Sequence, residues 1–174
     1  MASRAGRSGE NARRVGNICA HDRTQPQEGG RAVKADEEAL AESDRAFYEN
    51  PVHARMGLEI VQRLPHAVVR MQLSDDVRGA LPGTLHGGMI GTLADVTSAL
   101  ALWGAFDPEE QIPVTTDLHV RYYRQPRSSP ITAQAYLVHR GRRILSVECS
   151  VVDGEERQLA RATATYMIVP LGND

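Results

Sequence analysis

The first patterned segment of the chain predicts a short amphipathic helix. Residues 36–49 open with acidic side chains, which suit the positive end of a helix dipole. Leu40, Phe47 and Tyr48 fall near one face of this segment, and Pro51 follows it. We therefore expect one helix over residues 36–49 that ends before Pro51.

Two short segments with strand character follow this helix. Residues 56–62 and 66–73 contain the β-branched and apolar side chains typical of strands. The turn-prone residues Arg63, Leu64 and Pro65 separate them. The two segments are predicted to pair as a β-hairpin.

The second half of the chain is a succession of strand patterns joined by short connections, which favour antiparallel pairing. These segments are residues 114–123, 131–139, 144–152 and 159–169. In the first of them the side chains alternate, which predicts a regular strand whose buried face carries Val114, Thr116, Leu118, Val120 and Tyr122. In the third segment Cys149 shares a face with apolar neighbours, so we interpret it as a buried core thiol.

Residues 86–103 are too long for a typical strand and are apolar on nearly every side. A helix with that pattern is buried rather than amphipathic. The fold class is therefore α+β: five or six antiparallel strands that cover one long central helix.

Composition divides the chain into a basic tail and an acidic body. The 174 residues carry a net charge of −2, yet residues 1–34 hold seven basic and three acidic groups, which leaves −6 for the rest. The tail has few large apolar side chains and is predicted to be disordered. Residues 35–174 suit one globular domain. Cys19 and His21 supply too few ligands for a metal site, so we expect none.

Several classes of partner and location are disfavoured by the same composition. The overall charge and an aromatic content of 5% argue against nucleic acid. No segment reaches the length of apolar residues that a membrane span needs, and the two cysteines give no disulfide framework. A cytoplasmic protein is the expected default.

The segment GTLHGGMIGTLADV (83–96) breaks two local rules, because paired glycines disfavour the start of a helix and a carboxylate inside an apolar run is costly. It places His86, Gly87 and Gly88 nine to seven residues before Asp95. Further along the chain come the segment VTTDLHVRY at 114–122 and a turn at 141–145. Together with the order of elements, these motifs resemble the hotdog-fold acyl-CoA thioesterases, in particular the phenylacetyl-CoA thioesterase-like branch. The resemblance covers about residues 45 to 170.

Helical geometry separates the two ends of this motif. His86 and Asp95 are nine residues apart, which on a helix means a rotation of about 900° and a rise of about 13.5 Å. They point in opposite directions, so one subunit cannot readily place both in one pocket. A two-fold dimer, in which His86 and Gly87 of one chain meet Asp95 of the other, removes the difficulty. The resemblance implies the same arrangement, with the sheets joined edge to edge through residues 114–123.

The resemblance also implies roles for individual residues in hydrolysis of an acyl-CoA thioester, with no cofactor other than the CoA that belongs to the substrate. The Gly87 N–H would be the oxyanion donor, with Gly88 beside it, and His86 would orient the loop or contact the thioester. Asp95 would act as general base or as nucleophile, and Thr115 would hold the attacking water.

Two features bear on substrate binding and on how closely the chain follows the family. Basic side chains should line the mouth of a channel for the phosphates of CoA, and the candidates are Arg140, Arg142, Arg143, Arg121 and, next, Arg124. Fifteen residues before Asp95, where relatives commonly carry Asn or Gln, this chain has Ala80, so a neighbour such as Arg78 would have to substitute or the activity would be lower.

Two other functions stay open at this point. One is a non-catalytic acyl-CoA binder. The other is a hotdog hydratase or dehydratase, which usually pairs its acid with a histidine five residues on, where this chain has Leu100. Asp117 and His119 share a strand face without a third ligand nearby, so we interpret them as a solvated or dimer-facing pair. Self-association is expected as a homodimer, with a homotetramer left open.

Overall fold

The structure is a computed structural model that describes residues 37–172. The predictions for residues 1–34, including Cys19 and His21, lie outside the described residues. In chain order the described elements are two helices, a hairpin, a 3₁₀ turn, a long helix and four long strands: α1 (Glu37–Glu49), α2 (Pro51–Met56), β1 (Leu58–Gln62), β2 (Ala67–Met71), η1 (Asp75–Val77), α3 (Gly87–Leu100), β3 (Gln111–Tyr122), β4 (Ile131–Arg140), β5 (Ile144–Val152) and β6 (Gln158–Pro170).

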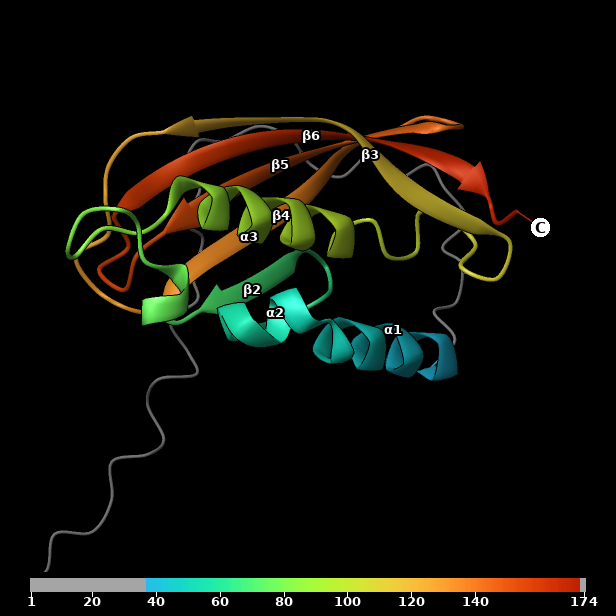
Figure 1. The fold of residues 1–174 in the computed structure, drawn as a ribbon. Coiled ribbons are helices and arrows are strands. Elements are labelled where there is room, and N and C mark those ends of the chain that lie inside the picture. The colour runs from blue at the N-terminus through green and yellow to red at the C-terminus, as the bar shows by residue number, and fades with distance from the viewer. Residues whose placement is uncertain (1–36, 173–174) are drawn as a thin grey trace, which may run out of the picture.

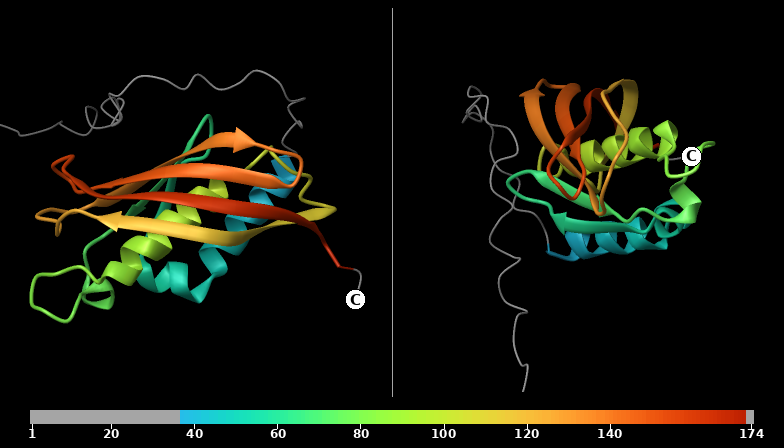
Figure 2. Two further views of the ribbon diagram at one scale, coloured as in Figure 1. Left: turned by 90° about the horizontal axis from the view of Figure 1, so that it is seen from above. Right: turned by 90° about the vertical axis from the view of Figure 1, so that its left-hand side faces the viewer.

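The six strands form one antiparallel sheet in the order β1-β2-β4-β5-β6-β3. The sheet curves over α3, while α1 and α2 lie on the opposite side of this helix from β5 and β6 (Figures 1 and 2). Although β3 follows α3 directly in the chain, it crosses to the far edge of the sheet and pairs with β6. The predicted α+β architecture, an antiparallel sheet wrapped around one long helix, is confirmed.

Burial of one side of α3 holds the layers together. Ile90, Leu93 and Ala94 on the helix are at most 2% exposed and belong to one core cluster with residues of the sheet and of α1 and α2. A fully buried side chain of this kind stabilises the fold by about 1.5–3 kcal/mol. The regular helix ends at Leu100, earlier than predicted, because the following residues close tighter bonds such as Trp103 N to the Leu100 carbonyl.

The helix predicted over residues 36–49 is confirmed as α1, which ends at Glu49, but a second helix that the sequence analysis did not predict begins at Pro51. The Asn50 side chain caps this second helix by accepting hydrogen bonds from the N–H groups of Val52 (2.9 Å) and His53 (3.4 Å). Pro51 is the first residue of this helix, a position where its missing N–H costs nothing. The helix ends at Gly57, which takes the left-handed conformation (φ 62°) that favours glycine.

The prediction of regular alternation along residues 114–123 is wrong, because β3 contains a β-bulge. Its register with β6 shifts between Thr115 and Asp117, so that Thr116 is an extra residue. Thr115 lies opposite Tyr166, and Leu118 lies opposite a core alanine two residues earlier on β6. Thr115 and Leu118 therefore share the inner face of the sheet, whereas regular alternation would place Thr115 on the outer face.

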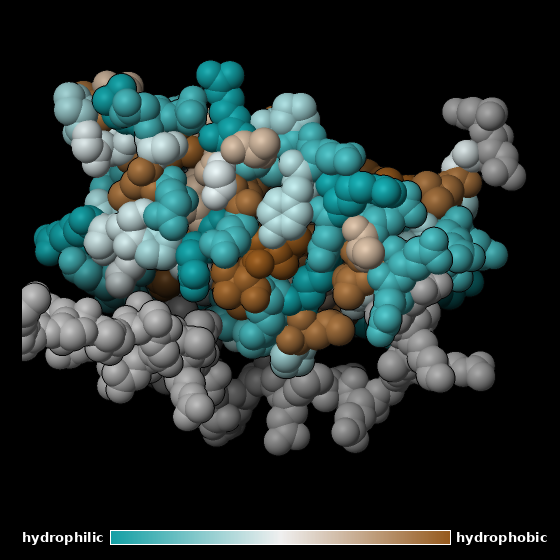
Figure 3. Space-filling view, turned by 90° about the horizontal axis from the view of Figure 1, so that it is seen from below, coloured by the Kyte–Doolittle hydropathy of each residue, from teal (hydrophilic) through white to brown (hydrophobic). Residues whose placement is uncertain are grey.

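The surface near α1 and α2 is mixed in character. Seen from below, apolar residues gather near the centre of the face and polar residues surround them (Figure 3). Among large apolar side chains, Val52 of α2 is 55% exposed and Tyr48 of α1 is 50% exposed. Within residues 37–172, no helix has the length and apolar character required to cross a membrane.

A buried carboxylate organises the turn between β5 and β6. Asp153 is 2% exposed and accepts hydrogen bonds from the backbone N–H groups of Arg127 (3.1 Å), Glu155 (3.1 Å) and Arg157 (3.0 Å), as well as from the Arg157 guanidinium. Burial raises the pKa of Asp153, but these hydrogen bonds outweigh burial and hold its pKa below the usual value.

Replacing this carboxylate should destabilise the protein in a pH-dependent way. Asp153→Asn should lower the free energy of unfolding at pH 7 by about 2 kcal/mol, because it removes a charged acceptor from several donors. The pKa of Asp153 is lower in the folded chain, so its contribution is present above an unfolded value of about 4 and is lost as the pH falls through the folded pKa. Urea unfolding of both proteins should therefore converge on acidification.

The matched control is Asp107→Asn, in an exposed turn where Asp107 accepts a hydrogen bond from the N–H of Glu109 (3.0 Å). It should change stability by no more than about 0.5 kcal/mol. A stability difference between wild type and Asp153→Asn that stays constant from pH 7 to below about 4 would contradict this interpretation.

Candidate active site

The N-terminus of α3 is capped by its own histidine. The Nδ1 atom of His86 accepts a hydrogen bond from the N–H of Gly88 (2.9 Å), which satisfies one of the free donors at the start of the helix. The ring is exposed. Because Nδ1 is an acceptor, the neutral imidazole carries its proton on Nε2, where it can donate to a ligand.

A side chain at Gly88 would crowd the imidazole of His86. A Cβ atom at Gly88 would lie 3.0 Å from both Cε1 and Nδ1 of His86. The role assigned to Gly88 in substrate binding remains a prediction, but its contact with His86 explains the second glycine of the motif. At Gly87 a Cβ would meet only ordinary contacts, the nearest being 3.7 Å from the Tyr122 ring.

The backbone N–H of Gly87 has no acceptor among the residues that the structure describes. Its carbonyl accepts a hydrogen bond from the hydroxyl of Tyr122 on β3 (3.0 Å). Gly87 is the first residue of α3, so its N–H lies at the positive end of the helix dipole. A ligand oxygen with developing negative charge would be stabilised there.

Two hydroxyl groups from the sheet meet the carboxylate of Asp95. Thr115 on β3 donates to Oδ1 of Asp95 (3.1 Å), and Tyr166 on β6 lies 3.0 Å from the same oxygen. The Tyr166 hydroxyl also lies 2.9 Å from the backbone carbonyl oxygen of Asp95. Asp95 is half-buried, so these donors offset part of the cost of placing a charge under the sheet.

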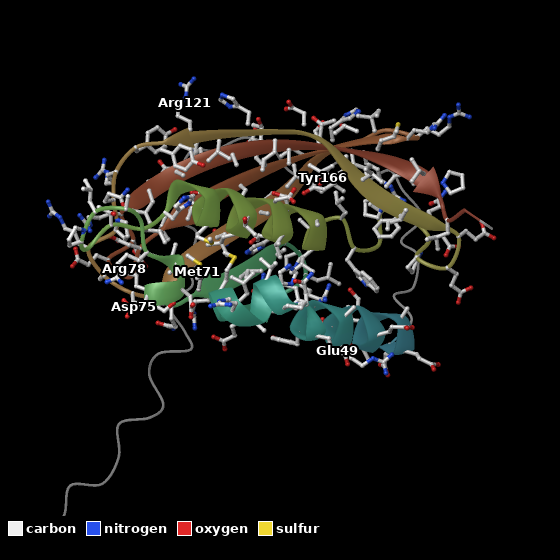
Figure 4. All side chains as sticks on the ribbon, in the orientation of Figure 1. Glu49, Met71, Asp75, Arg78, Arg121 and Tyr166 are labelled. Carbon is white, nitrogen blue, oxygen red and sulfur yellow. The ribbon has the colours of Figure 1, made fainter. Side chains whose placement is uncertain are left out.

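Tyr166 is a neutral donor in this cluster. It is 1% exposed, and its side chain lies between the sheet and α3 (Figure 4). Burial raises the pKa of Tyr166, and the negative charge of Asp95 raises it further, to well above the usual range. The phenol therefore keeps its proton at any physiological pH.

The structure keeps the two halves of the motif apart within one chain. Asp95 meets β3 at Thr115, whereas Gly87 meets β3 at Tyr122, seven positions further along the strand. Since β3 rises about 3.3 Å per residue, these contacts are about 20 Å apart along the strand, with the bulge taking up one residue. Asp95 and the Gly87 N–H thus lie in two separate half-sites along the edge strand.

The predicted phosphate-binding arginines are exposed and fall into two groups. Arg140, Arg142 and Arg143 lie at the turn between β4 and β5, where the Arg143 carbonyl accepts from Ile168 N (2.8 Å), two residues from Tyr166. Arg121 lies toward the other end of β3 and points away from α3 (Figure 4). The first group is therefore near the Asp95 half-site, and Arg121 is near the Gly87 half-site.

Arg78 does not reach Asp95 of its own chain. Its guanidinium pairs with Asp75 (3.2 Å) at one end of the molecule (Figure 4), and Ala80 lies exposed in the loop that leads to His86. Asp117 and His119 are exposed on the outer face of β3. Within residues 37–172, no group of three His, Cys, Asp or Glu side chains is arranged to hold a metal ion.

Tyr166 and Tyr122 are the contacts that the sequence analysis missed. Tyr166 follows the small residues Ala160, Ala162 and Ala164 on the inner face of β6, and the change from alanine to a large polar aromatic in that row is a signal that could have identified it. The prediction that Cys149 is a core residue is confirmed, since it is 3% exposed within the core cluster.

The chain is similar in sequence to known thioesterases. The family model of the thioesterase superfamily matches residues 82–160, which include Gly87, Asp95 and Thr115. The medium/long-chain acyl-CoA thioesterase YigI of Salmonella typhimurium is 28% identical over 153 residues, covering 79% of this chain and 98% of that protein. Its counterpart in Escherichia coli strain K12 has the same identity and coverage.

Solved structures share the fold. A thioesterase from Pseudomonas aeruginosa superposes with a TM-score of 0.69 at 22% identity and covers 80% of this chain and 97% of its own. A thioesterase from Haemophilus influenzae gives a TM-score of 0.68 at 22% identity, with coverages of 75% and 90%. The antiparallel sheet around a central helix is therefore the hotdog fold that the motif predicted.

A double-mutant cycle can test the steric relation between His86 and Gly88. Gly88→Ala should cost about 1 kcal/mol of stability, because its methyl group displaces the capping imidazole. In a His86→Ala background the same change should be neutral or stabilising, since alanine favours a helix more than glycine does. Equal destabilisation by Gly88→Ala in both backgrounds, measured by thermal unfolding, would show that the contact is unimportant.

Proposed function

This chain belongs to the thioesterase superfamily and is a thioester hydrolase, and from that premise we propose that its substrate is an acyl-CoA and that two subunits share each active site. The observation that carries the proposal is the arrangement around α3. A carboxylate fixed by two hydroxyls and a helix N-terminus with an open N–H both lie along the same edge strand.

Polarisation of the thioester carbonyl is assigned to the start of α3. The carbonyl oxygen would accept a hydrogen bond from the Gly87 N–H, where the helix dipole stabilises the negative charge that develops during attack. The absence of a side chain at Gly87 lets the substrate approach the backbone. His86, whose Nδ1 is engaged by Gly88, would present its Nε2–H to the thioester.

Asp95 acts as the general base in this proposal, because Thr115 is placed to hold a water beside it. The Thr115 hydroxyl donates its proton to Asp95, so its oxygen can still accept a hydrogen bond from water. Asp95 takes a proton as the water oxygen attacks the carbonyl carbon. The C–S bond then breaks, the proton passes to the thiolate sulfur, and the products are the free acid and CoA.

Dimerisation through β3 would unite the half-sites. Two β3 strands related by a two-fold axis would run antiparallel, so the Gly87 end of one chain would meet the Asp95 end of its neighbour. The surface of β3 supports this: Ile112 and Val114 are 45% and 42% exposed on a twelve-residue edge strand. A long edge with exposed apolar side chains is a liability in a monomer and is covered by pairing.

Medium- and long-chain acyl-CoAs are the first substrates to test. The relatives from Salmonella typhimurium and Escherichia coli are named for these substrates. Partly buried apolar side chains near α3, among them Met89, Val96 and Phe106, pack against the core and would suit an apolar acyl chain. Arg140, Arg142 and Arg143 remain the candidates for the CoA phosphates near Asp95.

The test of this function is release of CoA thiol from a panel of acyl-CoAs. Asp95→Asn should lower kcat by a factor of about 10³ or more while acyl-CoA still binds, because the base is lost and the shape is kept. Asp117→Asn, on the outer face of β3, is the matched control and should hydrolyse like wild type.

Three outcomes would contradict parts of the proposal. Equal, very slow hydrolysis by wild type and Asp95→Asn with binding retained would favour a non-catalytic acyl-CoA binder. Hydration of enoyl-CoA without thiol release would indicate a hydratase, against which Leu100 argues. An acylated Asp95, trapped and identified by mass spectrometry, would assign Asp95 as nucleophile instead of base.

A further inference from the structure

The hydroxyl of Tyr166 has two acceptors within reach and only one proton. It lies 3.0 Å from Oδ1 of Asp95 and 2.9 Å from the backbone carbonyl oxygen of the same residue. Both acceptors belong to the residue proposed as the base. The phenol ring is fixed by the core, since Tyr166 is 1% exposed and pairs in register with Thr115 on one side and Leu145 on the other.

The two oxygens of the Asp95 carboxylate differ in their surroundings. Thr115 and Tyr166 both act on Oδ1. Within the described residues, no hydrogen bond reaches Oδ2. The oxygen that already receives two hydrogen bonds is the less basic one, so a proton taken from water would settle on Oδ2.

We propose that Tyr166 is a positioning residue for Asp95: its hydroxyl holds Oδ1 while the carboxylate is charged and turns to the backbone carbonyl of Asp95 once Oδ2 has taken the proton from water. This role rests on the proposed function of Asp95. No bond to Tyr166 forms or breaks, and its own proton stays on the phenol oxygen throughout. The alternative acceptor means that the phenol never loses a hydrogen-bond partner when Asp95 becomes neutral, which would otherwise be costly in a buried site.

Few other side chains face Asp95 and Tyr166 among the described residues. From β3 comes the hydroxyl of Thr115, which lowers the pKa of Tyr166 through a side-chain hydrogen bond, and from β5 comes the thiol of Cys149, which raises that pKa. Burial and the charge of Asp95 are the larger causes of that increase, so the phenol remains a donor across the working pH range. No cationic side chain contacts Asp95 among the described residues, so the hydroxyls carry its stabilisation.

The experiment is Tyr166→Phe in the full-length protein, with acyl-CoA hydrolysis followed as a function of pH. Loss of a hydrogen bond to a charged group should lower kcat about 10- to 100-fold with KM changed less than about twofold. Tyr48→Phe is the matched control: it also removes a hydroxyl, which accepts from Ile60 N (3.1 Å) far from the site, and it should leave kcat and the profile unchanged.

A second variant, which retains the tyrosine ring and its hydroxyl, covers the case in which Tyr166→Phe does not fold. Incorporation of 3,5-difluorotyrosine at position 166 retains the hydroxyl as a donor, so most of the kcat lost in Tyr166→Phe should be kept. An unchanged kcat and pH profile in Tyr166→Phe, alongside an active wild type, would overturn the role of Tyr166 and leave the proposed function intact. A wild type without thioesterase activity would instead contradict the proposed function, and with it this role.

Discussion

A charged carboxylate on a buried helix must be met by hydrogen-bond donors, and this requirement at Asp95 shapes the surrounding structure. The sheet lies over α3, and the donors observed at Asp95 come from its strands. Tyr166 reaches down from β6, and Thr115 reaches across from the edge strand. Among the described residues no hydrogen bond reaches the other carboxylate oxygen, as the proposed role of Asp95 as a base requires.

The β-bulge at Thr116 is what brings the edge strand into this arrangement. If β3 alternated regularly through Thr116, Thr115 would lie on the outer face with Asp117, and the strand could not supply a hydroxyl to Asp95. Beyond the bulge, Leu118 and Val120 return to the inner face and Tyr122 reaches the Gly87 carbonyl. One strand thus contacts both half-sites, and because it lies at the edge of the sheet, it is also the strand through which a second subunit would join.

The sequence pattern was sufficient for the parts of the fold that periodicity controls. The buried helix, the hairpin and the later strands followed from runs of apolar side chains, and the helical rotation between His86 and Asp95 separated the motif into halves. It failed where a single residue overrides the period. Asn50 caps a new helix that begins at Pro51, a residue that the pattern interpreted as a stop. The bulge exchanges the inner and outer faces for the residues of β3 that precede it. Tyr166 was missed because its partner lies 71 residues away in the chain, which no local pattern can indicate.

Shared sites are most directly tested by mixing two inactive subunits. Gly87→Pro removes the proposed oxyanion N–H and adds a ring where the substrate would approach, while the helix is kept. Gly87 is the first residue of α3, where proline is tolerated, and His86 already has the extended backbone (φ −66°, ψ 128°) that precedes a proline. Each heterodimer of Gly87→Pro with Asp95→Asn would contain one doubly damaged and one intact site. Co-expression in equal amounts should therefore restore about a quarter of wild-type thioesterase activity. Heterodimers that form but stay as inactive as either parent would contradict a site built from two chains.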